Sequence, residues 1–130
     1  LAALFTPGSH GSTFAGNPLG AAAGLATLDV IEDENLVANA EARGEQLRDG
    51  IMATGNPLFV SVRGRGLLDA VELKHPCSHA VMNYCLEHGL IVNAVAPNAL
   101  RFAPPLIITA QDVDQALAIL KDVPTDLPDD

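Results

Sequence analysis

The order in which helical and strand-like segments follow one another is the feature that most constrains how this chain folds. Hydrophobic periodicity predicts helix, helix, strand, strand, helix, strand, strand and helix along the 130 residues. A doubly wound parallel sheet requires strands and helices to alternate strictly, and this order does not. The sequence therefore predicts an α+β fold, a small, mostly antiparallel sheet with helices packed on one side.

The predicted helices differ in the surfaces that they offer. The first is rich in alanine and glycine, so neighbouring backbone can approach it closely, and we expect it to be buried. In the third, Val81, Cys85 and Leu86 are expected to point inward. The last begins at a Thr109 and Asp112 pair that resembles a capping box. The helices are expected at residues 18–31, 35–53, 78–88 and 109–120.

The predicted strands come in two pairs. In the first pair, residues 58–66 and 67–73, apolar residues alternate, as at Val60 and Val62, and the intervening glycines indicate a hairpin turn. The RGRG sequence at this turn lacks the third glycine and the following helix of a dinucleotide-binding loop. The second pair is predicted at residues 90–94 and 99–103, where two prolines end it.

Composition and charge exclude several classes of partner. Apolar residues make up 48% of the chain, enough to build a core. The net charge of −9 and the lack of any Lys/Arg cluster argue against nucleic acid and against an anionic membrane surface. The longest apolar run, near residues 19–28, is too short to span a bilayer. We therefore expect a soluble, cytoplasmic protein.

The two cysteines are expected to be free thiols. Cys77 and Cys85 are eight residues apart in one predicted helix, which separates their Cα atoms by about 12 Å, too far for a disulfide. Cys77 also lies in the sequence HPCSH, between His75 and His79, and these are residue types that bind zinc. A fourth ligand and the usual spacing are missing, so the sequence favours no metal site.

The stretch HGSTFAGNPLG, residues 10–20, has two interpretations. Its hydroxyls and backbone N–H groups, next to the positive end of a helix dipole, suit an anion such as phosphate. Alternatively, Asn17 caps a helix that has Pro18 at its first position. The stretch alone favours the cap, because helix caps far outnumber anion sites.

Arg101 is the charged residue with the most unusual neighbours. It lies between Leu100 and Phe102 on a short predicted strand. Burying an unpaired guanidinium is costly, so this side chain either reaches back to solvent or is presented to an anion. Its local sequence does not decide between the two.

Three segments, in this order, are similar to successive blocks of the class III pyridoxal-phosphate-dependent aminotransferases. They are PGSHGSTFAGNPLGAAAGLATLDVI, VRGRGLLDAVEL and VNAVAPNALRFAPPLIIT. The resemblance implies pyridoxal 5'-phosphate as cofactor, amino-acid and 2-oxo-acid substrates and a homodimer. Thr13 matches the residue that binds the cofactor phosphate of the partner subunit, Ser12 would approach the substrate, and Arg101 matches the arginine that holds a substrate carboxylate.

The resemblance also implies how the chain divides. Residues 1–32 are expected to be the end of the large cofactor-binding domain, residues 33–122 the small C-terminal domain, and residues 123–130 a flexible tail. The resemblance covers only the C-terminal part of such an enzyme, and the sequence begins in mid-pattern without an initiator methionine. We therefore expect a piece of a longer protein.

One departure from the family pattern concerns the lysine that forms a Schiff base with the cofactor. The chain's two lysines, Lys74 and Lys121, do not match that position. No catalytic residue is therefore assigned, and we expect the chain by itself to be inactive. Two alternatives stay open: a class III aminotransferase of the ornithine or 4-aminobutyrate type, and a non-catalytic interaction module related to the small domain.

Overall fold

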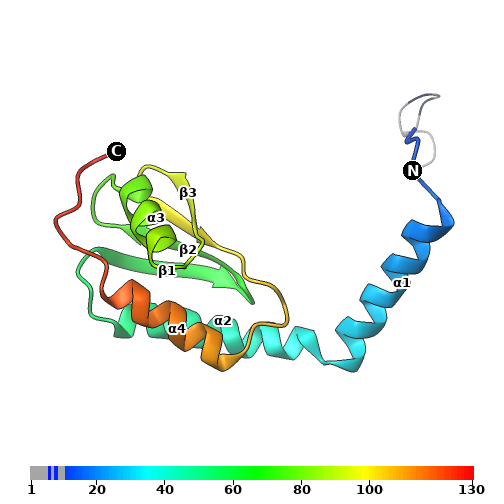
Figure 1. Ribbon diagram of the computed structural model, residues 1–130, viewed down its shortest axis with the longest axis horizontal. Helices are drawn as coiled ribbons and strands as arrows, with labels where there is room; N and C mark the ends of the chain where they lie inside the picture. The colour runs from blue at the N-terminus through cyan, green and yellow to red at the C-terminus, as the bar shows by residue number, and fades with distance from the viewer. Residues whose placement is uncertain (1–5, 7, 9–10) are drawn as a thin grey trace. The chain divides into compact units, whose positions relative to one another are not determined.

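The computed structural model describes residues 6, 8 and 11–130, and the chain divides into two units, Leu1–Glu34 and Asn35–Asp130. In the second unit, whose residues are all described, four antiparallel strands form one sheet in the order β1-β2-β4-β3 (Figure 1). The predicted α+β fold, with its small antiparallel sheet, is confirmed. The strands are β1 (Phe59–Arg65), β2 (Leu68–Leu73), β3 (Asn93–Ala96) and β4 (Ala99–Phe102).

The helices of the second unit begin and end close to their predicted bounds. They are α2 (Leu36–Ala53), α3 (Ser78–Glu87) and α4 (Ala110–Lys121), with α2 and α4 side by side in Figure 1. The capping box is confirmed: the Thr109 hydroxyl accepts from the Asp112 backbone N–H, and the Asp112 carboxylate accepts from the Thr109 backbone N–H.

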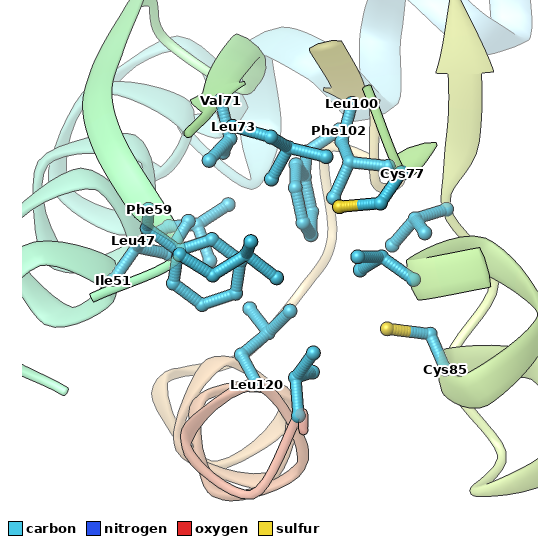
Figure 2. Close-up of a cluster of buried hydrophobic side chains, with 14 of the residues drawn as sticks. Leu47, Ile51, Phe59, Val71, Leu73, Cys77, Cys85, Leu100, Phe102 and Leu120 are labelled. Carbon is cyan, nitrogen blue, oxygen red and sulfur yellow. The ribbon is translucent and has the colours of Figure 1, made fainter. Parts of the chain in front are cut away.

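A single apolar cluster joins the three helices to one face of the sheet (Figure 2). Val71, Leu100 and Phe102 of the strands meet Ile51 of α2 and Leu120 of α4 there. All three helices contribute to this cluster, whereas alternate strand residues such as Leu68 and Arg101 are exposed, so the opposite face of the sheet carries no helix of this unit.

Both cysteines belong to this cluster. They are free, as predicted, and both are buried. The expectation that both lie in one helix is wrong for Cys77, which precedes α3, whereas Cys85 lies inside it. Burial raises the pKa of the Cys85 thiol to about 11, so the thiol stays protonated at neutral pH. The prediction that Leu86 also points inward is wrong, since its side chain is 58% exposed. Successive helix residues are about 100° apart, so Leu86 leaves the face that carries Val81 and Cys85.

Two strands contain a β-bulge that the alternation of the sequence did not predict. In β1 the register shifts between Phe59 and Ser61, so Val62 faces the core together with Phe59, and Val60 is 52% exposed. The interpretation that Val60 and Val62 share one face is therefore wrong. In β3 the register shifts between Ala94 and Ala96. This strand also begins at Asn93, three residues later than predicted.

The RGRG sequence forms the predicted glycine-bearing hairpin, and α2 packs closely against it. Gly66 has a φ of +57° in the turn, a backbone conformation that favours glycine. A side chain at Gly44 of α2 would collide with the backbone carbonyl of Gly66. This close approach explains a glycine in the middle of a helix, where glycine is otherwise unfavourable.

An ion pair between a partly buried arginine and a buried aspartate links the same hairpin to α2. Arg48 of α2 donates from Nη1 to the Gly66 carbonyl and to Oδ1 of Asp69, each at 2.9 Å. Asp69 is 1% exposed, and its Oδ2 accepts no hydrogen bond from a described residue. Burial raises the pKa of the Asp69 carboxyl, while the Arg48 guanidinium opposes that rise. Arg48 therefore favours the charged form of this carboxylate.

The first unit contains helix α1 (Pro18–Asp33). Asn17 caps it by accepting from the Gly20 backbone N–H at 2.8 Å, and Pro18 occupies the first turn, so the predicted cap is confirmed. No residue of α1 is buried, and its apolar side chains, such as Leu19 at 81% and Leu25 at 63%, are exposed. The expected burial is not observed, because the described residues of this unit include no second layer that could cover the Gly/Ala surface. That residues 1–32 end a larger domain stays a prediction.

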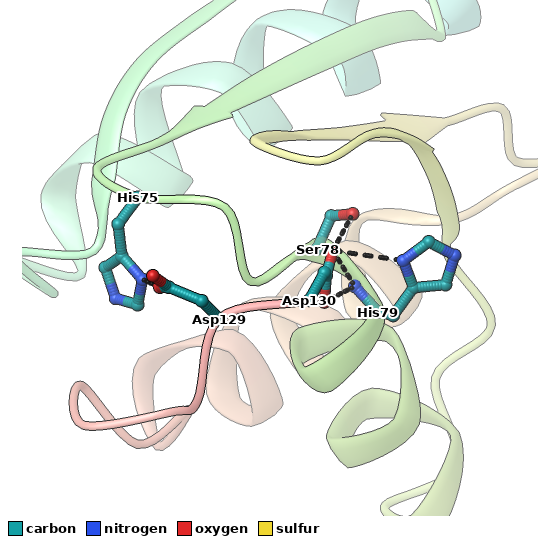
Figure 3. Close-up of polar contacts among 5 residues, drawn as sticks. All are labelled: His75, Ser78, His79, Asp129 and Asp130. Carbon is teal, nitrogen blue, oxygen red and sulfur yellow. Dashed lines mark hydrogen bonds and ion pairs between the residues drawn. The ribbon is translucent and has the colours of Figure 1, made fainter.

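The last residues of the chain contact α3 (Figure 3). The Asp130 carboxylate accepts from the Ser78 hydroxyl at 3.0 Å and from the His79 backbone N–H at 3.0 Å, and it contacts His79 Nδ1 at 3.0 Å. His75 Nδ1 lies 2.7 Å from the Asp129 carboxylate. Both histidines of HPCSH thus contact carboxylates, and the described residues contain no group that could hold a metal ion. The predicted flexibility of residues 123–130 stays a prediction.

These contacts predict a pH-dependent step in stability. Desolvation raises the pKa of Asp130, but hydrogen bonds from His79 and Ser78 outweigh it and hold the pKa at about 2, against an ordinary value of 3.8. The stabilisation is therefore present above pH 4 and is lost as the pH falls toward 2. We expect Asp130→Asn to lower the thermal midpoint at pH 7, with a difference from wild type that shrinks below pH 4. Asp126→Asn is the tail control, and an equal effect of both substitutions would contradict the role of Asp130.

Candidate functional site

Arg101 lies on the sheet face that carries no helix of the second unit. In β4 it is flanked by Leu100 and Phe102, which both face the core, so its own side chain points to the opposite side and is exposed. The strand register pairs Arg101 with Ala70 of β2 on one side and with Asn93 of β3 on the other. The sheet, rather than a flexible loop, therefore positions this guanidinium.

Two cavities border Arg101. One, of about 310 Å³, is formed by the end of β4 together with apolar residues that include Pro104 and Pro105. The other, of about 430 Å³, lies over Ala70 and is bordered by Arg63 and Leu68. Arg101 thus presents its charge beside space that a small molecule can enter.

The guanidinium of Arg101 has no carboxylate partner in the part of the chain that the structure describes. Its one hydrogen bond there runs from Nη2 to Oδ1 of Asn93, at 3.2 Å. An arginine offers five N–H donors, so most of them stay available for a ligand. A carboxylate can accept two parallel hydrogen bonds from such a group.

Ser12 and Thr13 share an exposed turn in front of α1. The Ala15 backbone N–H donates to the Ser12 carbonyl at 3.3 Å, and neither hydroxyl has a hydrogen bond to a described residue. Residues 7, 9 and 10 of the matching sequence block lie outside the described residues. The structure thus brings Ser12 and Thr13 together, whereas Arg101 belongs to the other unit.

The turn has the chemistry that a phosphate requires. It precedes the positive end of the α1 dipole, and the acidic residues of α1 begin only at Asp29, toward the opposite end. The Asn17 side chain already accepts from the Gly20 N–H, so the hydroxyls of Ser12 and Thr13 and nearby backbone N–H groups are the donors left for an anion. The residues present therefore fit a phosphate group, and the assignment of Thr13 stays a prediction.

Sequence reasoning missed Asn93 as a neighbour of Arg101. The two residues are eight positions apart, and their side chains meet only because β3 pairs with β4. Because residues 90–92 are apolar, the sequence predicted a strand that begins at residue 90, and the pairing of Asn93 with Arg101 was not foreseen.

Neither Lys74 nor Lys121 lines the two cavities beside Arg101. Among the described residues, no helix has the length and apolar character needed to cross a membrane.

The chain is similar to aminotransferases over nearly its whole length. A model of the family Aminotransferase class-III matches residues 1–123. The acetylornithine aminotransferase of Bifidobacterium longum (strain NCC 2705) is 99% identical over all 130 residues, which are 30% of that protein. The ornithine aminotransferase of Staphylococcus carnosus (strain TM300) is 46% identical over 92% of this chain and 30% of its own length. The chain therefore spans about 30% of the length of these relatives.

Solved structures share the fold. The acetylornithine aminotransferase of Elizabethkingia anophelis matches with a TM-score of 0.78 and 39% identity, over 92% of this chain and 33% of that one. The ornithine aminotransferase of Toxoplasma gondii ME49 matches with a TM-score of 0.80 and 35% identity, over 92% of this chain and 30% of that one. The α+β arrangement of this chain is thus one that aminotransferases use.

Proposed function

Since this chain belongs to the class III aminotransferase family, we propose that it is the C-terminal part of an enzyme that moves an amino group from N-acetylornithine to 2-oxoglutarate in arginine biosynthesis. The observation that carries this proposal is the 99% identity to an acetylornithine aminotransferase over all 130 residues. The relative is longer than this chain, so the activity is assigned to the full-length enzyme. We place that enzyme in the cytoplasm.

Arg101 would bind a carboxylate of the substrate. Both substrates of the proposed reaction carry carboxylates, and this guanidinium borders two cavities without an acidic partner among the described residues. A planar guanidinium grips a carboxylate with two parallel hydrogen bonds, which fixes both the position and the orientation of the substrate. Arg101 would therefore act by orientation and charge, and not by proton transfer.

Thr13 would hold the phosphate of pyridoxal phosphate, and Ser12 would approach the substrate. When bound, this cofactor supplies an electron sink for chemistry at the carbon that carries the amino group. We place Thr13 at the cofactor of the partner subunit in a homodimer. Support comes from the exposed turn, its two hydroxyls without described partners, and the helix end beside it.

A second candidate substrate is ornithine without the acetyl group. The observation in its favour is the 46% identity to an ornithine aminotransferase, close to the 44% identity to the acetylornithine aminotransferase of Gloeobacter violaceus. These two relatives do not separate the donors, and the name of the 99% identical relative supports N-acetylornithine as the first candidate.

Steady-state assays of the full-length enzyme test the proposal. With 2-oxoglutarate as acceptor and glutamate formation as the readout, we expect kcat/KM for N-acetylornithine to exceed that for ornithine by at least about tenfold. A preference for ornithine would support the second candidate. The absence of glutamate with either donor would exclude both. The 130-residue chain alone should form none, because neither Lys74 nor Lys121 matches the reactive lysine of the family.

Thr13→Ala tests the phosphate assignment in the same enzyme. Loss of a hydrogen bond to a charged group should weaken cofactor binding by about 1 to 3 kcal/mol. The affinity is measured from the cofactor absorbance that the enzyme retains after dialysis against decreasing concentrations of pyridoxal phosphate. Thr27→Ala is the matched control, because the Thr27 hydroxyl donates within α1 to the Ala23 carbonyl at 2.8 Å. Unchanged cofactor affinity in Thr13→Ala would remove Thr13 from the site.

A further inference from the structure

We propose that Asn93 is a positioning residue that orients the Arg101 guanidinium for carboxylate binding, an inference that rests on the proposed function. The two residues are register partners across β3 and β4, so their side chains leave the sheet on the same face. Arg101 Nη2 donates to Asn93 Oδ1 at 3.2 Å. The strand pairing thus places a neutral acceptor directly beside the arginine.

The lining of the cavity beside this pair indicates that the contact between Asn93 and Arg101 serves ligand binding. Twelve residues line the cavity of about 310 Å³. Asn93 and Arg101 are the two whose side chains can form hydrogen bonds, and they bond to each other. The other lining side chains are apolar, such as Leu90, Pro104 and Ile108. One oriented polar pair against an apolar wall is the arrangement that fixes a small ligand in a single pose.

Orientation matters here because Arg101 is exposed. A long side chain on an open sheet face samples many rotamers, and fixing it before the substrate arrives reduces the entropy lost on binding. The amide acceptor holds one N–H of the guanidinium and leaves its positive charge unneutralised. A carboxylate at position 93 would instead bind the guanidinium itself and compete with the substrate.

Three substitutions of Asn93 in the full-length enzyme test whether it orients the Arg101 guanidinium and whether a charge at this position would compete with the substrate. Asn93→Leu removes the acceptor and should raise KM for both carboxylate substrates by about 5- to 20-fold, with kcat unchanged within about twofold. Asn93→Asp should raise KM further, by about 10- to 100-fold, through competition for Arg101. Asn93→Gln keeps an amide acceptor, so its KM should lie within about threefold of the wild-type value.

Asn98→Asp is the matched control. Asn98 lies in the turn of the same β3–β4 hairpin, is also exposed, and lines neither cavity beside Arg101. The same added charge there should leave KM unchanged, and cofactor absorbance and the thermal midpoint should stay at wild-type values in all four variants.

Two results would overturn the inference. One is a wild-type KM in Asn93→Leu, and the other is an Asn93→Gln or Asn98→Asp enzyme as impaired as Asn93→Asp. If the wild-type enzyme forms no glutamate from either donor, the proposed function itself fails. That outcome is distinct, because it is seen before any substitution is made.

Discussion

Replacing Arg101 by lysine in the full-length enzyme is expected to lower kcat/KM for its carboxylate substrates by about thirty- to several-thousand-fold. Lysine keeps the positive charge but offers a compact ammonium in place of a planar fork, so it cannot form two parallel hydrogen bonds with a carboxylate. Losing such a desolvated contact costs about 2 to 5 kcal/mol. Steady-state kinetics with N-acetylornithine and 2-oxoglutarate measure the effect. Cofactor absorbance should be unchanged.

Arg65→Lys is the control for this substitution. Arg65 is an exposed arginine of the β1–β2 hairpin, and it lines neither cavity beside Arg101. Its replacement should leave kcat/KM at the wild-type value. An Arg101→Lys enzyme that turns over N-acetylornithine and 2-oxoglutarate normally would show that Arg101 is a surface residue without a role in substrate binding.

Replacing Asp69 by alanine is expected to lower the free energy of unfolding of the chain by about 2 to 4 kcal/mol. The substitution leaves Arg48, whose side chain is 22% exposed, without its buried partner. Removing one member of a buried ion pair is strongly destabilising even where the intact pair contributes little, because the remaining charge loses its compensation. Urea unfolding, followed by circular dichroism, measures the difference.

Two further variants test whether the loss of stability is specific to the ion pair of Arg48 and Asp69. Glu72→Ala removes a carboxylate from the same strand, but Glu72 lies on the open face and contacts the Ser61 hydroxyl at 3.0 Å, so it should cost less than about 1 kcal/mol. Replacing Arg48 and Asp69 together by leucine should recover part of the loss, since no unpaired charge remains. An Asp69→Ala chain as stable as wild type would falsify the assigned role of the pair.

Local patterns were sufficient to predict most elements of this fold. The capping box at Thr109, the Asn17 cap with Pro18, and the hairpin glycines each act within a few residues of the chain. Physical rules for caps and turns apply at that range. The order of helices and strands then limited the architecture to an antiparallel sheet with helices on one side, which the structure has.

Features that depend on distant partners could not be predicted in this way. The bulge after Phe59 changes which valine of β1 faces the core, and alternation alone cannot reveal an inserted residue. Leu86 follows the buried Cys85 in sequence, but the position of α3 on the sheet leaves it exposed. The Arg48 and Asp69 pair joins residues 21 positions apart and follows from how α2 crosses the hairpin.

In the candidate site too, some residues could be predicted from the local sequence and others only from the fold. Arg101 could be singled out because a charged residue between apolar neighbours on a short strand needs an explanation. Its assignment to a carboxylate, and those of Ser12 and Thr13, came from the resemblance to a family and stay predictions. Asn93 could be recognised only after the register of β3 and β4 was known.

The two β-bulges affect whether another chain can add a strand to the edges of this sheet. β1 and β3 are the edge strands, and each carries one extra residue, near Val60 and Val95. A straight edge strand exposes a row of unpaired N–H and C=O groups that another chain can extend into a longer sheet. A bulge twists that row and breaks its spacing, and β1 also carries arginine side chains. Both edges are thus poor templates for strand addition, which favours a sheet that ends at four strands over one that aggregates.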